Sequence, residues 1–254
     1  MVKAKKHLGQ HFLTDDSISE RIVNSLTGHG GYKQVLEIGP GTGALTQFLV
    51  KKDLDVALLD IDDESIDFLK IEYPFLINSI FKADFINDAL PEKLNAPFAI
   101  IGNFPYNISS QIMFKVIDLK DEVPEVVGMF QKEVAERLVC GPGSKVYGIL
   151  SVLLKLWYDG EYLFTVDEHV FDPPPKVKSG VIRFKRNSRS ELEVSEKFFK
   201  TVVKLAFNQR RKTLRNSLKS LINEKGVDAS LPIFSERPEQ LSVEQFIELT
   251  KIFT

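Results

Sequence analysis

The chain has 254 residues, with 33 Lys and Arg against 35 Asp and Glu, so its formal net charge is only −2. A chain of this length can bury a sizeable core, either as one large domain or as a larger and a smaller one. Because its charges nearly balance, the net charge gives no indication of a polyanionic partner. The single cysteine, Cys140, excludes an intramolecular disulfide and a cysteine-rich metal site.

The expected compartment follows from similar features. A single cysteine fits a reducing environment. The N-terminal segment MVKAKKHLGQHF is basic but lacks the apolar run of a signal peptide, and no stretch approaches the ~18 apolar residues of a membrane span. His7, His29 and His169 lack the spacing of metal ligands. We therefore expect a cytoplasmic protein that binds no membrane and no metal and is a monomer.

From about residue 34, short runs rich in β-branched residues alternate with segments whose apolar residues recur every three or four positions. The predicted strands are QVLEIG, DVALLDI, SIFKAD, FAIIGN and EVVGMF. The helical segments between them are ALTQFLVKK, DESIDFLKIEY and SSQIMFKVIDL. This alternation predicts an α/β fold, a parallel sheet with crossover helices.

The later part of the chain changes character. After KEVAERLVC and the loop GPGSKVYG come GILSVLLKLWY, EYLFTV, the proline-rich loop FDPPPK and SGVIRF. The two late strands are predicted to lie antiparallel at one sheet edge. From about residue 191 the pattern is wholly helical, so we expect one domain over residues 1–190 and a small helical domain over 191–254.

A glycine-rich turn, GPGTG, follows the first strand at residues 39 to 43 and leads into a helix. Such a turn brings the backbone close to a ligand at the carboxyl ends of the strands. A nucleotide-triphosphate loop is disfavoured because Gly43 is followed by Ala44 rather than by Lys. A dinucleotide remains possible, although the spacing is GxGxG rather than GxGxxG.

A third ligand, S-adenosylmethionine, fits the acidic residues near this turn. Glu37 precedes the glycines, while Asp60 and Asp84 end the second and third predicted strands. The carboxyl ends of parallel strands meet at one edge of the sheet, so all three acids are expected in one crevice. Carboxylates would attract the sulfonium cation and bind ribose hydroxyls, whereas they would repel phosphates.

The fourth predicted strand ends in GNFPYN, residues 102 to 107. The Asn103 side-chain oxygen and a backbone carbonyl can each accept one hydrogen of an exocyclic amine, Pro105 stiffens the turn, and the ring of Tyr106 can stack on a base. Two acceptors that suit a more tetrahedral nitrogen favour the transition state of methyl transfer to an adenine amine. No strong base is needed before attack, since the proton can leave afterwards.

Five ordered motifs identify a family resemblance. EIGPGTGALT, GNFPYNISS, MFQKEVAERL, VFDPPPKVKSGVIRF and AFNQRRKTLRNSL resemble the KsgA family of small-subunit ribosomal RNA adenine dimethyltransferases, and the match runs from GQHFL at residue 9 to near residue 220. The resemblance implies a Rossmann-like class I methyltransferase sheet with a helical C-terminal domain. It also implies dimethylation of two adjacent adenosines in the 3′-terminal hairpin loop of 16S rRNA in the small ribosomal subunit.

By position in these motifs, the resemblance implies a cofactor site. His11 and Leu13 would line the pocket, with Gly39 and Gly41 beside the methionine moiety. Asp60 would bind the ribose hydroxyls, and Asp84 the adenine amino group of the cofactor. The family usually has Asn where His11 stands and often Glu where Asp60 stands.

The resemblance assigns the target base to a neighbouring set of residues. Asn103 would bridge cofactor and substrate amine, the carbonyl of Phe104 would be the second acceptor, and Tyr106 would stack on the base with Phe171 on the opposite face. The family has Leu where Phe104 stands, so this residue is expected to act through its backbone.

Basic residues cluster despite the acidic net charge. Residues 200–219 hold seven basic side chains and residues 176–189 hold six, with no acid in either stretch. If residues 203–221 continue as one helix, Lys204, Asn208, Arg211, Arg215 and Lys219 form one polar stripe, opposite an apolar one. The predicted RNA-binding residues are Lys178, Arg183, Arg210, Arg211, Lys212, Arg215 and Lys219.

Three alternatives remain. Methyltransferases of the antibiotic-resistance type, which modify an adenosine of large-subunit RNA, share the NxPYN segment, but AFNQRRKTLRNSL favours the small-subunit branch. A DNA adenine methyltransferase is disfavoured because no target-recognition domain of adequate size remains. A protein that chiefly binds immature subunits as an assembly checkpoint, with methylation secondary, is compatible with the main prediction.

Overall fold

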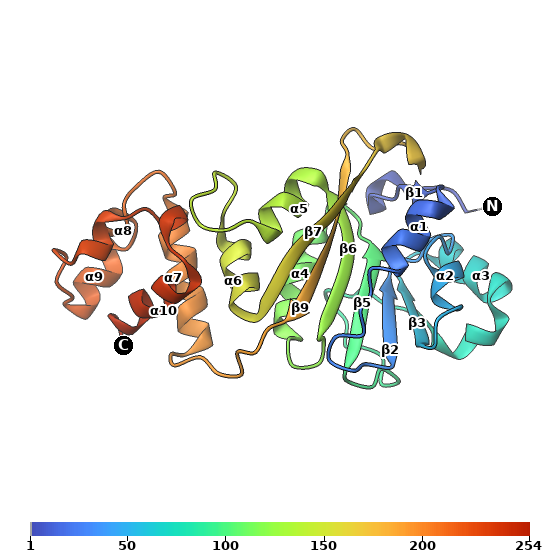
Figure 1. Cartoon of the computed structure of the whole chain (residues 1–254), viewed down its shortest axis with the longest axis horizontal. Helices are drawn as coiled ribbons and strands as arrows, with labels where there is room; N and C mark the ends of the chain where they lie inside the picture. The colour runs from blue at the N-terminus through green and yellow to red at the C-terminus, as the bar shows by residue number, and fades with distance from the viewer. Residues whose placement is uncertain (1) are drawn as a thin grey trace. The chain divides into compact units, whose positions relative to one another are not determined.

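The computed structural model describes residues 2–254 and divides the chain into two compact units (Figure 1). The first unit contains the chain up to Glu136 together with Asp159–Arg186, and the second contains Arg137–Tyr158 together with Asn187–Thr254. The sequence had placed one division between residues 190 and 191. The structure differs because residues 137–158 join the helical unit, where α6 (Ile149–Trp157) packs with α7 (Glu196–Asn208) and α10 (Val243–Lys251).

A seven-stranded sheet forms the centre of the first unit. Its order is β4 (Ile80–Lys82), β3 (Asp55–Asp60), β2 (Gln34–Ile38), β5 (Phe98–Asn103), β6 (Glu125–Gln131), β9 (Ser179–Arg186) and β7 (Tyr158–Val166). The first five strands of this order are parallel, and β9 is antiparallel to β6. The predicted α/β class is confirmed, with the refinement that β9 lies inside the sheet and β7 forms the edge.

Strand register places the functional strand ends at one edge of the sheet. Ile38 at the end of β2 lies opposite Leu59 of β3, and Asn103 at the end of β5 lies opposite Met129 of β6. The chain therefore leaves β2, β3 and β5 at the same edge, as ligand sites in open parallel sheets require.

Helices flank this sheet because its strands are apolar on both faces. They are α1 (Asp16–Val23), α2 (Thr46–Leu49), α3 (Asp63–Glu72), α4 (Ser109–Asp118) and α5 (Lys132–Val139), with short 3₁₀ turns η1 (Lys6–Leu8), η2 (Pro74–Ser79) and η3 (Glu168–Val170). Alternate strand residues such as Val35, Leu58 and Ile101 share one core with Ile22 of α1 and Ile66 of α3. The continuous apolar runs of the strands and the three- or four-residue spacing of the helices were both readable in the sequence.

A second, two-stranded sheet connects the N-terminal segment to the proline-rich loop. Strand β1 (Phe12–Leu13) is antiparallel to β8 (Phe171–Asp172), with Leu13 opposite Phe171. Thr14 extends the pairing, since its backbone N–H donates to the carbonyl of Val170 at 2.9 Å. This pairing brings GQHFL and FDPPP together although about 160 residues separate them.

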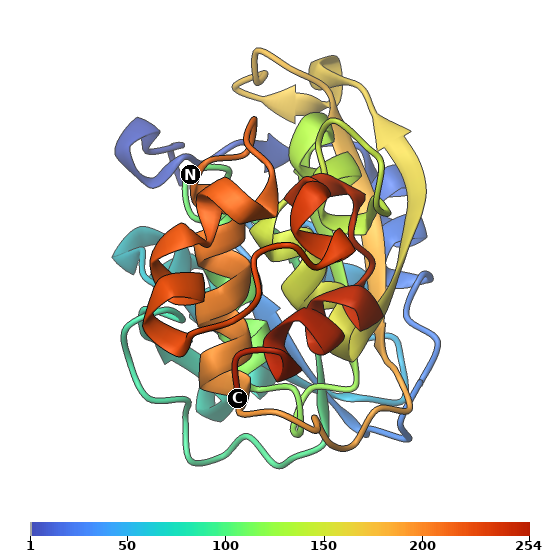
Figure 2. The same ribbon diagram turned by 90° about the vertical axis from the view of Figure 1, so that its left-hand side faces the viewer.

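The second unit is helical, as predicted, and Figure 2 shows its helices side by side. Besides α6 it contains α7 (Glu196–Asn208), α8 (Leu214–Ser217), α9 (Lys219–Lys225), α10 (Val243–Lys251) and the 3₁₀ turns η4 (Pro232–Ser235) and η5 (Pro238–Gln240). In the part of the chain that the structure describes, no helix has the length and apolar character of a membrane span.

Residues 203–221 do not continue as one helix, which was the condition for the polar stripe. Helix α7 ends at Asn208, Gln209 adopts φ −123° and ψ 62°, and α8 begins only at Leu214. The break is stabilised by tertiary contacts, because the Leu214 N–H donates to the Glu236 carbonyl at 2.8 Å and its side chain is fully buried. The predicted polar stripe therefore does not lie along one helix.

Candidate active site

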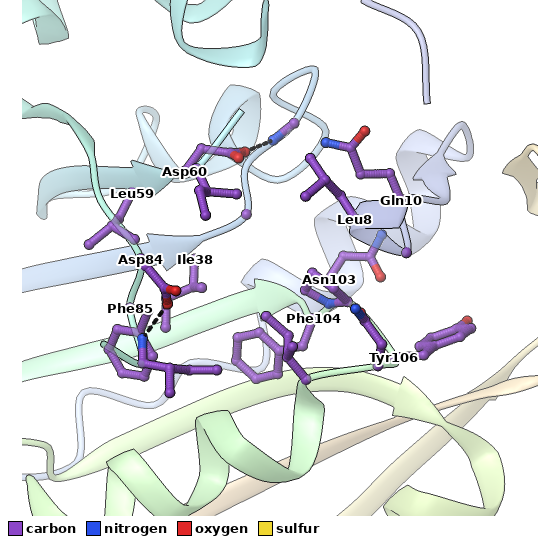
Figure 3. Close-up of a pocket in the computed structure, with 18 of the residues that line it drawn as sticks. Leu8, Gln10, Ile38, Leu59, Asp60, Asp84, Phe85, Asn103, Phe104 and Tyr106 are labelled. Atoms are coloured by element: carbon purple, nitrogen blue, oxygen red, sulfur yellow. Dashed lines mark hydrogen bonds between the residues drawn. The ribbon is translucent and has the colours of Figure 1, made fainter. Parts of the chain in front are cut away.

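A pocket of about 230 Å³ lies at the carboxyl ends of β2, β3 and β5 (Figure 3). Five segments of the first unit form most of its wall: residues 7–12, the glycine loop after β2, the turn after β3, the turn after β4, and residues 103–108. Figure 3 shows Asp60 and Asp84 on one side, Asn103, Phe104 and Tyr106 on the other, and Leu8 and Gln10 above Asn103.

The glycine loop takes a backbone course that other residues rarely adopt. Gly39, Gly41 and Gly43 have φ of 67°, 54° and 81°, in the left-handed region. A Cβ on Gly41 would lie 2.8 Å from the ring of Phe12, so this position also has no room for a side chain. The loop is therefore a close-fitting wall whose backbone can contact a ligand directly.

Asp60 ends β3 and is 6% exposed. Its Oδ2 accepts from the Gly41 N–H at 3.2 Å and its Oδ1 from the Asp62 N–H at 2.9 Å. Burial raises the pKa of Asp60, and the backbone hydrogen bonds from Asp62 and Gly41 oppose this. A carboxylate has about four acceptor positions, so Asp60 retains capacity to accept from ribose hydroxyls.

Asp84 lies in the turn after β4, on the same side of the pocket. Burial alone would raise its pKa, but hydrogen bonds from the Asn87 side chain and the Ile86 N–H hold the pKa below its usual value. These bonds are 2.7 Å and 2.8 Å long. The group is thus an ionised acceptor at neutral pH.

Asn103 at the end of β5 is oriented by the N-terminal segment. Its Nδ2 donates to the backbone carbonyl of His11 at 2.9 Å. A carbonyl only accepts, so the nitrogen must face His11, and Oδ1 is the acceptor that remains for a ligand in the pocket. The amide is thereby set in the orientation that binding of an amino group requires.

Phe104 packs beneath the pocket, where glycines of two neighbouring strands leave space for its ring. The side chain is 1% exposed and meets Phe130 edge-on, with ring centroids 5.1 Å apart. A Cβ on Gly102 or Gly128 would lie 2.6 Å or 2.4 Å from the Phe104 ring. Two glycines therefore leave the space that the Phe104 ring occupies.

Tyr106 lines the pocket with its ring and is anchored at its hydroxyl. The hydroxyl lies 2.6 Å from the Ser179 hydroxyl at the start of β9. Burial raises the pKa of Tyr106, against the hydrogen bond to Ser179, so the phenol is neutral at physiological pH. The His11 ring is stacked on Tyr106, with centroids 5.5 Å apart and an interplanar angle of 28°.

Similarity to known proteins identifies the family of the chain that forms this pocket. The family model of ribosomal RNA adenine dimethylases matches residues 1–254, the whole chain. The chain belongs to this family. The resemblance seen in the motifs is thereby confirmed, and with it the predicted enzyme class, a methyltransferase that uses S-adenosylmethionine.

Individual relatives of this dimethylase agree. A ribosomal RNA small subunit methyltransferase A of Cytophaga hutchinsonii is 59% identical over 100% of this chain and 98% of its own. One of the same name from Parabacteroides distasonis is 58% identical over 99% of this chain and 94% of its own.

Solved structures of similar fold include a dimethyladenosine transferase from Plasmodium falciparum, with TM-score 0.75, 26% identity and coverage of 94% of this chain and 96% of that one. The 23S rRNA methyltransferase ErmE has TM-score 0.66, 26% identity and coverage of 94% and 99%.

The pocket of this dimethylase fits S-adenosylmethionine. At Gly39 an added Cβ would come no closer than 3.8 Å to another residue, so the loop leaves space there that suits the methionine part of the molecule. Asp60 and Asp84 offer acceptors for ribose hydroxyls and for an adenine amino group. Their negative charge also complements a sulfonium cation.

Three predicted site residues lie away from the pocket wall. Leu13 and Phe171 are 5% and 4% exposed and belong to the hydrophobic core. Because side chains alternate along β1, Phe12 meets the pocket and Leu13 the core. Phe171, paired with Leu13, lies in the same core, and the ring next to Tyr106 is that of His11.

Glu37 also lies away from the wall, although it precedes the glycines. The alternation of β2 puts Ile38 in the pocket and leaves Glu37 1% exposed, where its Oε2 accepts from the Thr46 hydroxyl at 2.6 Å. Of the three acids expected in one crevice, the structure brings Asp60 and Asp84 together there.

Sequence reasoning missed several residues of the wall. Phe12, Gln10, Ile61, Phe85 and Asn107 all line the pocket. Two of them flank His11 in GQHFL, and Asn107 is the last residue of NxPYN. Their place within short motifs was the available signal.

The predicted RNA-binding residues differ in what they contact. Lys178 pairs with Asp167 at 2.5 Å, and Arg183 donates to the Ser25 carbonyl at 2.9 Å. Arg210 donates to the Lys145 carbonyl, and Arg215 to the Ala229 carbonyl at 3.0 Å. Exposed side chains in the same helical unit include Arg211, Lys212 and Lys219.

Proposed function

We propose that this dimethylase modifies N6 of two adjacent adenosines in the 3′-terminal hairpin loop of 16S rRNA in the small ribosomal subunit. The observation that carries the proposal is the orientation of Asn103, whose amide nitrogen is held by the His11 carbonyl. Its free acceptor faces an acidic, glycine-walled pocket that fits S-adenosylmethionine. The names of the relatives support the choice of the small-subunit RNA.

The side chains around the pocket have distinct roles in this reaction. Bound S-adenosylmethionine supplies an electrophilic methyl group on a sulfonium sulfur. Asp60 and Asp84 bind the cofactor, while Asn103 Oδ1 and the Phe104 carbonyl accept the two amine hydrogens of the target adenosine. Tyr106 stacks on the extruded base, and its hydroxyl contact with Ser179 keeps the ring in place.

The acceptors make the amine reactive without a strong base. They suit a nitrogen that is becoming tetrahedral, so they bind the transition state better than the planar ground state. For the same reason the neutral phenol of Tyr106 need not lose its proton. Release of the amine proton follows methyl transfer.

For the base to contact both Tyr106 and Phe171, as the family resemblance implies, Phe171 would have to leave the core. We therefore propose His11 as the aromatic neighbour that supports Tyr106 in this chain. The exposed cations Arg211, Lys212 and Lys219 are proposed to contact phosphates of the RNA. Further positive charge is proposed to come from four residues that are each held by a protein partner, namely Lys178, Arg183, Arg210 and Arg215.

We further propose that the protein acts as a monomer in the cytoplasm and without a metal. Among residues 2–254, no three or more His, Cys, Asp or Glu side chains are grouped as a metal site would require. The proposed chemistry also needs no metal, because the methyl group is already activated on sulfur.

The test is transfer of a labelled methyl group to undermethylated small ribosomal subunits, followed by nuclease digestion and identification of the nucleoside. The wild type is expected to yield dimethyladenosine at two adjacent positions. Asn103→Ala should lower the rate at least about a hundredfold, because an oriented acceptor in the transition state is lost, while subunit binding changes little.

The outcomes separate the alternatives. Label in large subunits would favour the antibiotic-resistance activity instead. Subunit binding by the wild type without methyl transfer would favour a pure assembly checkpoint. A fully active Asn103→Ala variant would contradict the role of Asn103.

A further inference from the structure

Residues 5–13, here called the N-terminal strap, close one side of the pocket. Residues 7–12 of the strap line it. The fit is close at two points: a Cβ on Gly9 would lie 2.6 Å from Oδ1 of Asn107, and Phe12 occupies the space beside Gly41. The strap therefore has to be in place for the pocket to have this shape.

One end of the strap is held mainly by the carboxylate of Asp62, which contacts two strap residues. Lys5 Nζ contacts Asp62 Oδ1, and Gln10 Nε2 donates to Asp62 Oδ2 at 3.1 Å. The backbone N–H of Lys5 also donates to Gln10 Oε1 at 2.8 Å, which joins the two strap residues. Glu64 adds a second partner for Lys5 at 3.1 Å.

Asp62 is itself rigidly placed. Its side chain is 1% exposed, and it caps α3 by accepting from the Glu64 N–H at 3.2 Å. Its backbone N–H donates to Asp60, which lies in the cofactor pocket. Burial alone would raise the pKa of Asp62, but the contacts with Lys5 and Gln10 hold it below its usual value, so the carboxylate is charged.

The other end of the strap reaches the substrate side. The His11 carbonyl accepts from Asn103 Nδ2, and His11 Nδ1 lies 2.7 Å from the Pro173 carbonyl. Since a carbonyl only accepts, Nδ1 is the protonated nitrogen. One short segment therefore joins the cofactor-side carboxylates to the amide that receives the substrate.

We propose that Asp62 is a positioning residue for methyl transfer: through Lys5 and Gln10 it holds the strap, and the His11 carbonyl of the strap orients the Asn103 amide. This inference rests on the proposed function. An ion pair exposed to solvent contributes little to stability. The Asp62 carboxylate, by contrast, is buried and contacts both Lys5 and Gln10. Loss of its charge should therefore make the whole strap more mobile.

The test compares Asp62→Asn with Asp63→Asn. Asn is as good a helix cap as Asp, so the first variant keeps α3 while it loses the charge that Lys5 contacts. The control loses the adjacent carboxylate, which is 72% exposed and pairs with Lys82 at 2.6 Å. Both variants change the net charge equally.

We expect Asp62→Asn to lower kcat by about tenfold and to raise KM for the cofactor by a similar factor. In the absence of cofactor, amide hydrogen exchange of residues 8–13 should quicken by at least about tenfold, while exchange in β2 and β5 stays unchanged. Asp63→Asn should match the wild type in all three measurements. Lys5→Met should reproduce the effects of Asp62→Asn, and the double variant should add little.

Unchanged hydrogen exchange of the strap in Asp62→Asn would overturn the proposal, as would a kcat equal to that of the wild type. Quickened exchange throughout the sheet would show a general loss of stability and would also overturn it. The exchange measurement needs no activity, so an inactive wild type would contradict the proposed function without deciding the role of Asp62.

Discussion

Glu37 illustrates how burial changes the chemistry of a single residue. The sequence places this acid next to the glycine loop, where an ionised carboxylate was expected to face the sulfonium. In the structure, burial raises the pKa of Glu37 to about 8, the hydrogen bond from Thr46 lowers it, and the charge of Asp60 raises it further. The group is therefore mainly protonated at neutral pH, and the acids that line the pocket are Asp60 and Asp84.

A pH dependence of stability follows from this residue. The folded-state pKa of about 8 lies above the ordinary value of 4.5, so the folded protein binds the proton more tightly. The stabilisation is complete below the ordinary value and is lost as pH rises toward the folded-state value. Glu37→Gln keeps an acceptor for Thr46 but cannot titrate.

The free energy of unfolding, measured with denaturant at several pH values, should thus fall more steeply for the wild type than for Glu37→Gln between about pH 5 and pH 8. Subtraction of the two curves removes the contributions of all other groups. A difference that stays constant across this range would show that Glu37 titrates normally.

At the scale of elements, the ends of β5 and β6 determine where the NxPY segment lies. The Phe104 N–H donates to the Met129 carbonyl at 3.2 Å, which continues the pairing of the two strands past Asn103. The ring of Phe104 then fills the space left by Gly102 and Gly128. The packing of Phe104 at the end of β5 thus helps to fix the position of the Asn103 amide.

Gly128→Ala should disturb this packing, because the new Cβ would lie 2.4 Å from the Phe104 ring. Overpacking of this kind costs about 1–3 kcal/mol, and the shift of Phe104 should lower kcat by about tenfold or more. Adding Phe104→Leu removes the larger ring and should restore part of the activity.

Methyl-transfer rates of the two variants and of Gly141→Ala check this expectation. Gly141 serves as the control because an added Cβ there meets no atom within 4 Å. If Gly128→Ala were as active as the control, the packing of Phe104 would have no influence on the site.

At the scale of the whole molecule, the chain enters the helical unit twice, once between α5 and β7 and again after β9. The methyl-transfer pocket belongs entirely to the first unit, whereas most of the predicted RNA-binding residues belong to the second. Cofactor binding and RNA binding should therefore be separable by mutation.

Charge reversal of Arg211 and Lys212 tests this separation. Both side chains are exposed. Arg215 is not used because it donates a hydrogen bond to the Ala229 carbonyl, so that reversing its charge would also disturb the fold. The double reversal to Glu should weaken RNA binding and reduce the salt dependence of binding by about one phosphate contact per residue, with cofactor affinity unchanged.

Binding isotherms at several salt concentrations give the slope. A control with Lys33→Glu and Lys70→Glu, exposed residues of the first unit, makes the same change in net charge. Equal weakening in the control would mean that net charge alone matters, and loss of cofactor binding in the Arg211 and Lys212 variant would contradict the separation of the two sites.

The sequence by itself determined the order of strands and helices along the chain, the glycine turn, and the placement of Asp60 and Asn103 at strand ends and of Asp84 just after one. These features depend on local properties, namely apolar periodicity and the backbone freedom of glycine, which a single segment already displays. The motifs further identified the family before any contact was known.

Only the tertiary structure decided which side of a strand each residue faces, which unit α6 joins, and that helix α7 ends at Asn208. Leu13 and Phe171 are paired between β1 and β8 and pack into the core of the first unit. The start of α8 is held by the hydrogen bond from the Leu214 N–H to the Glu236 carbonyl. The hold of Asp62 on the strap likewise joins residues more than 50 positions apart. Such contacts form between distant segments, so no local pattern records them.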